Sequence, residues 1–154
     1  MPRDLHLKAA AVAVALITAG GCHGMDTASS DRANSASGTL ADSRWLAEDI
    51  DGRPVAAGAQ AIGQATVEFQ GTDRIAGSTG CNHYSGPVTV GADSFSVGIL
   101  ATTRRACSPP LMSQEQRFTD ALTAARRYSI EGATLRLFDA SGAERLRLSR
   151  STGQ

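Results

Sequence analysis

Two cysteine-bearing segments constrain the folded part of this chain more than any other feature. Cys81 lies within Gly-Cys-Asn-His-Tyr-Ser-Gly at residues 80–86, and Cys107 ends Thr-Thr-Arg-Arg-Ala-Cys at residues 102–107. A disulfide between them would close a loop of about 26 residues and contribute about 3 kcal/mol by restricting the unfolded chain. The alternatives are a metal site of Cys81, His83 and Cys107, which lacks a fourth ligand, and a redox pair, which lacks the usual Cys-x-x-Cys spacing.

The first 22 residues have the pattern of an export signal. Arg3 and Lys8 are followed by an apolar run at residues 9–17 that is too short for a permanent membrane span. Ala-Gly-Gly at residues 19–21 then precedes Cys22 and resembles a bacterial lipoprotein box, although such boxes usually begin with Leu. We expect residues 1–21 to be a lipoprotein signal peptide and Cys22 to carry the lipid. The alternative is ordinary secretion with Cys22 left as a free thiol.

The segment after Cys22 predicts a tether. Residues 22–43 are rich in Ser, Ala, Gly and Asp and hold few large apolar side chains, so they are expected to link the acylated cysteine flexibly to a folded domain. The predicted location is a membrane-anchored lipoprotein of the bacterial cell envelope. His23 after the lipidated cysteine favours the outer membrane, facing the periplasm, in a Gram-negative cell. Export also favours the disulfide between Cys81 and Cys107.

Residues 44–150 have the length of one compact domain. Short apolar segments are separated by Gly, Asp and Ser, at 44–50, 66–69, 74–77, 84–90, 94–97, 99–103, 128–131, 134–138 and 144–148, and they predict eight or so strands. We predict a mostly β (α+β) fold, a small antiparallel β-barrel with one inserted helix, because closure removes exposed strand edges. The alternative is an open sheet wrapped round the helix.

The inserted helix follows Cys107. It is expected to start either at Ser108 and Pro109, with proline in the first turn, or at Ser113, with Gln116 three residues later. Its apolar face is predicted to pack on the sheet and consists of Leu111, Phe118, Leu122 and Ala125.

Several of these motifs occur together in one known family. Residues 80–86, the strand ending at residues 103–107, the proline that follows, and Met112, Glu115 and Phe118 together resemble the META domain, the family also named after the heat-shock lipoprotein HslJ. The resemblance covers residues 44 to about 148 and implies a conical β-barrel with one helix. It implies no reaction, since most members have no assigned biochemical activity, and His83 fills a variable position of the motif.

Asn82, His83 and Tyr84 are candidates for a polar binding rim, because a loop beside glycines presents hydrogen-bonding side chains. The competing interpretation, which we favour, has Asn82 capping a turn, Tyr84 packed inward and His83 merely solvated. His83 is the only histidine of residues 44–150, and no serine is marked as its nucleophile. We therefore expect no enzyme, no catalytic residues, no cofactor and no metal.

A second candidate surface is basic. Arg136, Arg145 and Arg147 share one face of the last two strands and could meet anionic headgroups or an acidic partner, although an ordinary solvated face explains them as well. The whole chain is formally neutral with 5% aromatic residues, which argues against nucleic acid as a partner.

These features predict a non-enzymatic envelope lipoprotein, a binding or stress-protection module held at a membrane through Cys22. Its expected partner is an envelope protein. The alternative function is a lipocalin-like carrier of a small apolar ligand inside the barrel, which the narrow interior of so small a domain disfavours.

Overall fold

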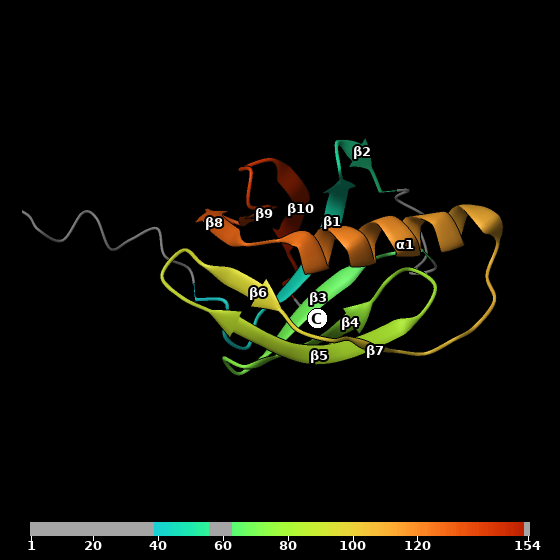
Figure 1. Ribbon diagram of the computed structural model, residues 1–154, viewed down its shortest axis with the longest axis horizontal. Helices are drawn as coiled ribbons and strands as arrows, with labels where there is room; N and C mark the ends of the chain where they lie inside the picture. Colours follow the sequence, from blue (N-terminus) through green and yellow to red (C-terminus); the bar gives the residue numbers. More distant parts are fainter. Residues whose placement is uncertain (1–38, 56–62, 153–154) are drawn as a thin grey trace, which may run out of the picture. The chain divides into compact units, whose positions relative to one another are not determined.

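The computed structural model describes residues 39–55 and 63–152 (Figure 1). The predicted signal peptide, Cys22 and the tether up to residue 38 lie outside the described residues. Within the described part, no helix has the length and apolar character needed to span a membrane. The elements are β1 (Arg44–Ile50), β2 (Arg53–Pro54), β3 (Thr66–Gln70), β4 (Arg74–Ser78), β5 (His83–Val90), β6 (Phe95–Val97), β7 (Ala101–Thr102), α1 (Pro109–Ala124), β8 (Arg127–Glu131), β9 (Thr134–Phe138) and β10 (Glu144–Arg150).

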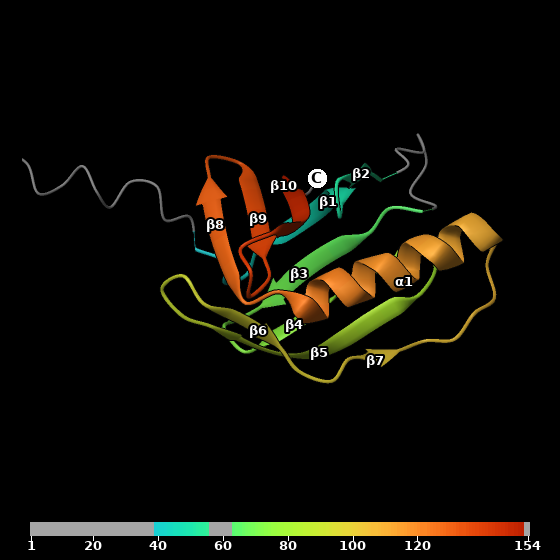
Figure 2. The same ribbon diagram turned by 45° about the horizontal axis from the view of Figure 1, so that its top comes forward.

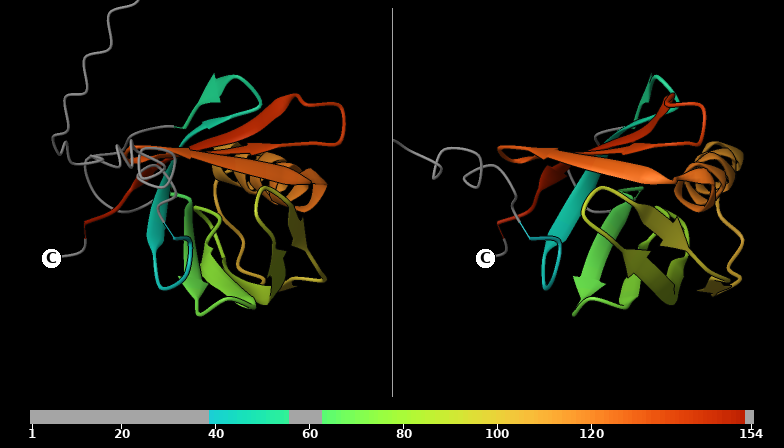
Figure 3. Two further views of the ribbon diagram at one scale, coloured as in Figure 1. Left: turned by 90° about the vertical axis from the view of Figure 1, so that its left-hand side faces the viewer. Right: turned by 60° about the vertical axis from the view of Figure 1, so that its left-hand side comes forward.

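The strands form one antiparallel sheet in the order β6-β5-β4-β3-β1-β10-β9-β8, with β2 on β1 and β7 on β5. The two end strands approach each other, since the Phe95 amide donates to the Arg126 carbonyl at 2.9 Å and the Tyr128 amide to the Asp93 carbonyl at 3.0 Å. Figure 3 shows the resulting curvature, with β8–β10 facing β3–β6 across the core. The predicted fold, a mostly β, nearly closed antiparallel barrel with one helix, is confirmed.

The helix closes one side of this barrel. α1 begins at Pro109 with Ser108 as its N-cap residue, so the proline of the first turn sets the start and Ser113 lies inside the helix. Its buried residues are Gln114, Phe118, Ala121 and Leu122. This face contacts β1, β6 and β10, and Figure 2 shows the helix lying over β5. Of the predicted apolar face, Leu111 is only half-buried, because it lies in the first turn.

The barrel interior is filled by the protein's own side chains. Leu135, Leu137, Leu146 and Leu148 are fully buried, as the alternation of β9 and β10 predicted. They join one continuous cluster with Trp45, Val67, Phe69, Ile75, Tyr84, Phe95, Phe118 and Leu122. The core of the barrel is therefore packed side chains rather than a cavity for a ligand.

The folded unit extends upstream of Arg44 into residues that the sequence analysis assigned to the tether. Leu40 is buried in the core cluster, and the Ser43 hydroxyl donates to the Leu40 carbonyl. The same hydroxyl accepts a hydrogen bond from the Trp45 indole Nε1 at 2.8 Å, so the tryptophan that opens β1 fixes this segment. The periodicity of apolar residues cannot predict such a contact, because Leu40 is the one side chain of residues 39–43 that joins the core cluster.

Candidate functional site

The site is built on the tight turn between β4 and β5. The Thr79 amide donates to the Asn82 carbonyl at 2.8 Å, and the Thr79 hydroxyl accepts from the Asn82 amide at 2.9 Å. Gly80 has a φ of +96°, and a Cβ there would lie 2.5 Å from Gln114 Nε2 and 2.7 Å from the Gly63 carbonyl oxygen. Glycine is required at this position for both its backbone conformation and its lack of a side chain.

A disulfide ties this turn to the segment before the helix. Cys81 is bonded to Cys107, with the two Cα atoms 6.0 Å apart and a sequence separation of 26. Cys81 is buried, whereas Cys107 is partly accessible. With both sulfurs oxidised, neither is a thiolate ligand, so the metal site considered for Cys81, His83 and Cys107 is not formed. The disulfide instead joins the β4–β5 turn to the start of α1.

The Asn82 side chain makes a second connection across the same gap. Its Oδ1 accepts from the Arg105 amide at 2.8 Å and from the Thr103 hydroxyl at 2.9 Å. Its Nδ2 donates to the Arg105 carbonyl at 3.3 Å and to Glu115 Oε2 at 2.9 Å. The carboxamide thus pairs with the Arg105 backbone as a peptide group would, and it also holds the helix. Asn82 is 4% exposed, so its role in the fold is that of a buried clamp.

The three residues of the candidate binding rim do not share one surface. Tyr84 is buried, and its hydroxyl donates to the Thr66 carbonyl at 2.8 Å. Burial, with a smaller effect of the Glu68 carboxylate, raises the pKa of Tyr84. His83 is exposed, and its backbone amide bonds the Thr103 hydroxyl at 3.1 Å. Since successive residues of β5 point to opposite sides, the side chains of His83 and Tyr84 face opposite ways, and of the three side chains only that of Asn82 bonds to the segment that ends at Cys107.

A surface hollow of about 310 Å³ lies between this segment and the first turns of the helix. Its lining residues include Thr103, Arg104, Arg105, Met112 and Glu115, beside Asn82. The Arg105 guanidinium donates to the Cys81 carbonyl at 2.9 Å, whereas Met112 is 51% exposed. The hollow therefore offers guanidinium groups and one apolar side chain at an end of the barrel that is held rigidly.

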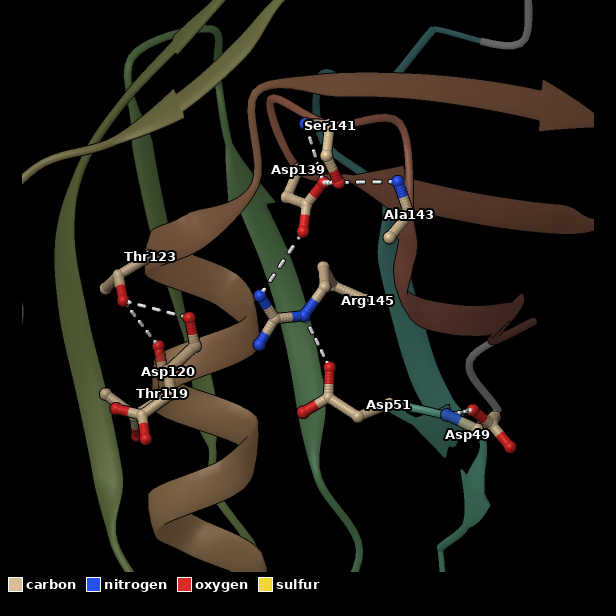
Figure 4. A network of polar contacts seen from close by, with 10 residues as sticks. Asp49, Asp51, Thr119, Asp120, Thr123, Asp139, Ser141, Ala143 and Arg145 are labelled. Carbon is tan, nitrogen blue, oxygen red and sulfur yellow. Dashed lines mark hydrogen bonds and ion pairs between the residues drawn. The ribbon is translucent and has the colours of Figure 1, made fainter.

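The arginines of the candidate basic face are paired with acidic residues. Arg145 lies 2.5 Å from Asp51 and 3.5 Å from Asp139 (Figure 4). The Asp51 carboxylate raises the pKa of Arg145. Asp139 also accepts from the Ser141 hydroxyl at 2.6 Å, which is the main reason that the pKa of Asp139 is lowered, with backbone amides and Arg145 adding to it.

The other two arginines of this face are paired as well. Arg147 lies 3.7 Å from both Asp49 and Glu144. Arg136 lies 3.7 Å from Glu131 and 3.8 Å from Glu144. The face is therefore a strip of alternating charges across β1, β10, β9 and β8 rather than an accumulation of positive charge.

Sequence reasoning missed Gln114 altogether. Its side-chain Nε2 donates to the Gly63 carbonyl at 2.6 Å. Gln114 is 4% exposed because it lies on the helix face that packs on the barrel. A polar residue on a predicted core face was the available signal, because buried amides are kept only where they have partners.

Removing the disulfide should destabilise the domain. For Cys81→Ser we expect the free energy of unfolding to fall by about 2–5 kcal/mol, because the 26-residue loop is no longer closed in the unfolded chain. Urea unfolding without reductant measures this loss. Cys107→Ser should give the same loss, and adding reductant to the wild type should reproduce it. An unchanged unfolding midpoint in both variants would contradict a stabilising bridge.

Replacing the buried carboxamide should test the clamp. Asn82→Asp keeps the acceptor for the Arg105 amide but removes the donor and sets a carboxylate opposite Glu115. We expect a loss of about 1–3 kcal/mol at neutral pH, because the Arg105 carbonyl loses its partner and like charges face each other. Adding Glu115→Gln to the variant should restore part of the loss, since a donor then faces the new carboxylate. If the second substitution adds its own cost instead, the two side chains do not interact as described.

Comparison with known proteins identifies the family of this domain. The NMR structure of a protein from Burkholderia xenovorans is 28% identical, with a TM-score of 0.62 over 74% of this chain and 85% of that chain. A second NMR structure is 23% identical, with a TM-score of 0.56 over 70% of this chain and 88% of that one, and supports the fold alone. No curated protein matches the chain significantly. The META domain matches residues 38–152, which include the Asn82 turn, the disulfide and the helix, and the chain therefore belongs to the META domain family.

Proposed function

We propose that this chain is a non-enzymatic META-domain lipoprotein of the cell envelope, tethered to a membrane through Cys22, which serves as a binding or stress-protection module through its outer surface. The observation that carries the proposal is the filled barrel. Leucines of β9 and β10 and the aromatic residues Trp45, Phe95 and Phe118 occupy the interior and are at most 1% exposed. A partner or ligand is therefore expected to meet the outside of the domain.

The same observation does not favour the alternative of a lipocalin-like carrier. A carrier barrel needs an interior left empty by its own side chains. Here the helix also contributes Phe118, Ala121 and Leu122 to the single core cluster. The apolar hollow of about 220 Å³ at the opposite end, beside Leu40, Phe69 and Tyr128, is open to the surface and smaller than a usual ligand pocket.

The non-enzymatic part of the proposal rests on the chemistry of the groups around the Asn82 turn. The Glu115 carboxylate accepts from the Asn82 amide, and the cysteines of this end form a disulfide. His83 lies on the exposed side of β5. General acid–base or nucleophilic catalysis needs a reactive group held within hydrogen-bond reach of a second one, and these residues offer no such pair.

The membrane tether follows from the sequence of residues 1–22 and is tested by fractionation. We expect the wild-type protein in the membrane fraction and Cys22→Ser in the soluble fraction, because the thiol that would receive the lipid is absent. Ala19→Leu, which introduces the residue usual in lipoprotein boxes, is the matched control and should stay with the membrane. If Cys22→Ser also stays there, an uncleaved signal segment or the charged face of β9 and β10 provides the attachment.

Complementation of a deletion strain tests whether the function depends on His83. We expect His83→Ala to restore growth under envelope stress as well as the wild type does, because this exposed side chain makes no contact on which the fold depends. His83→Ala should fold normally, with an unchanged urea midpoint as the control. A folded but inactive His83→Ala variant would contradict the expectation that His83 is merely solvated.

A further inference from the structure

β7 and the residues that follow it up to Ala106 form an edge of the sheet that is paired on one side only. In the antiparallel register of β7 on β5, Ser85 faces Ala101 and Tyr84 faces Thr102, and β7 pairs with no other strand. The Thr103 amide continues the pairing by donating to the His83 carbonyl at 3.0 Å.

Pairing in such a ladder alternates along the strand. Because Thr103 bonds inward to β5, and the Arg105 amide and carbonyl bond inward to the Asn82 side chain, the backbone groups of Thr102, Arg104 and Ala106 face the other way. No backbone bond in the described part of the chain reaches Arg104 or Ala106. These three residues therefore leave backbone donors and acceptors on the side away from β5 without partners among the described residues.

Two features beside this line suit a bound segment. Ile99, 93% exposed, and Met112, 51% exposed, are the large apolar side chains that the described residues leave in solvent. Ile99 precedes the open edge, and Met112 lines the 310 Å³ hollow together with Arg104 and Ala106. An added strand gains its affinity from main-chain hydrogen bonds and its specificity from neighbouring recesses that take alternate side chains.

Charge indicates which segment would fit. Arg136, Arg145 and Arg147 on β9 and β10 each have an acidic partner, whereas Arg104 and Arg105 form no ion pair within the described residues. Glu115 shares their hollow, but its Oε2 accepts from Asn82. A second copy pairing through the same edge would bring arginines close to arginines, which disfavours it.

We infer that the open edge at residues 101–106 binds an extended, carboxylate-bearing segment of a partner protein as an added strand. Exposed edges are normally blunted to prevent such pairing. Here Arg104 and Arg105 repel an identical edge and attract an acidic one. The inference rests on the proposed function, since it names the class of partner for the outer surface, but its test does not depend on the membrane tether.

The probe is a phage-displayed library of random peptides of about 12 residues, selected against the full exported chain carrying Cys22→Ser. That length is enough to pair along the open edge and to reach Ile99 and Met112. We expect the selected peptides to be extended sequences containing Asp or Glu, and their affinity to fall with added salt, as attraction between exposed charges does. A selected peptide, made synthetically with a fluorophore, then gives Kd by anisotropy.

The decisive variant is Thr102→Pro, which removes one outward amide and leaves the bonds toward β5 in place. We expect it to weaken the peptide at least tenfold, while Thr102→Val, which keeps the amide and the branched shape, binds as the wild type does. Arg104→Glu should also weaken binding tenfold or more. The matched control is Arg53→Glu, which reverses the charge of an exposed residue on β2. We expect it to leave the Kd for the peptide unchanged.

Nuclear magnetic resonance of the unsubstituted edge keeps the test independent of any folding defect in Thr102→Pro. The peptide should shift the amides of Thr102, Arg104 and Ala106 more than those of Ala101 and Thr103. No enriched peptide, enrichment of basic peptides, or shifts elsewhere on the domain would overturn the inference. If the edge binds acidic peptide but Cys22→Ser remains in the membrane fraction, the tether is wrong and the edge stands.

Discussion

The attachment of the β4–β5 turn to residues 103–107 is the interaction on which this end of the domain depends. β7 contributes only two paired residues, which are too few to hold the connection between β5 and α1. The disulfide of Cys81 and the carboxamide of Asn82 supply the rest, one covalently and one through three hydrogen bonds to Thr103 and Arg105. Because the same carboxamide also reaches Glu115, the turn, the linker and the helix are fixed as one unit.

Because side chains fill the barrel, a partner is expected to bind the outer surface, and the arrangement of charge there indicates where. Arg136, Arg145 and Arg147 on β9 and β10 pair with acidic residues of β1, β8, β10 and the neighbouring turns, and an exposed pair such as Arg136–Glu131 is worth little by itself. Beside β7, Arg104 and Arg105 line a hollow, and neither forms an ion pair within the part of the chain that the structure describes. The contrast matters more than the number of arginines, since a paired guanidinium attracts an incoming carboxylate less than an unpaired one does.

The sequence was informative where a pattern is local. Alternation predicted which leucines of β9 and β10 are buried, and the two cysteines outside the export signal predicted the bridge. It could not predict partners that lie far apart in the chain. Asn82 and Glu115 are 33 residues apart, and Asp51 and Arg145 are 94 apart. Alternation shows which face a side chain occupies, but the strand order β1-β10-β9 decides what lies across from it.

The same reasoning explains why the open edge, rather than the basic face predicted from the sequence, is the candidate binding surface. Arg136, Arg145 and Arg147 stood out because alternation grouped them, yet folding brings acids of β1 and the turns beside them. Arg104 and Arg105 lie in a segment with no periodicity. Their significance depends on Asn82, which satisfies the inward backbone groups of Arg105 and so leaves the outward groups of its neighbours displayed. The disulfide and the Asn82 clamp already order this segment in the folded domain. Binding of an added strand would therefore lose mainly the conformational entropy of the added strand itself.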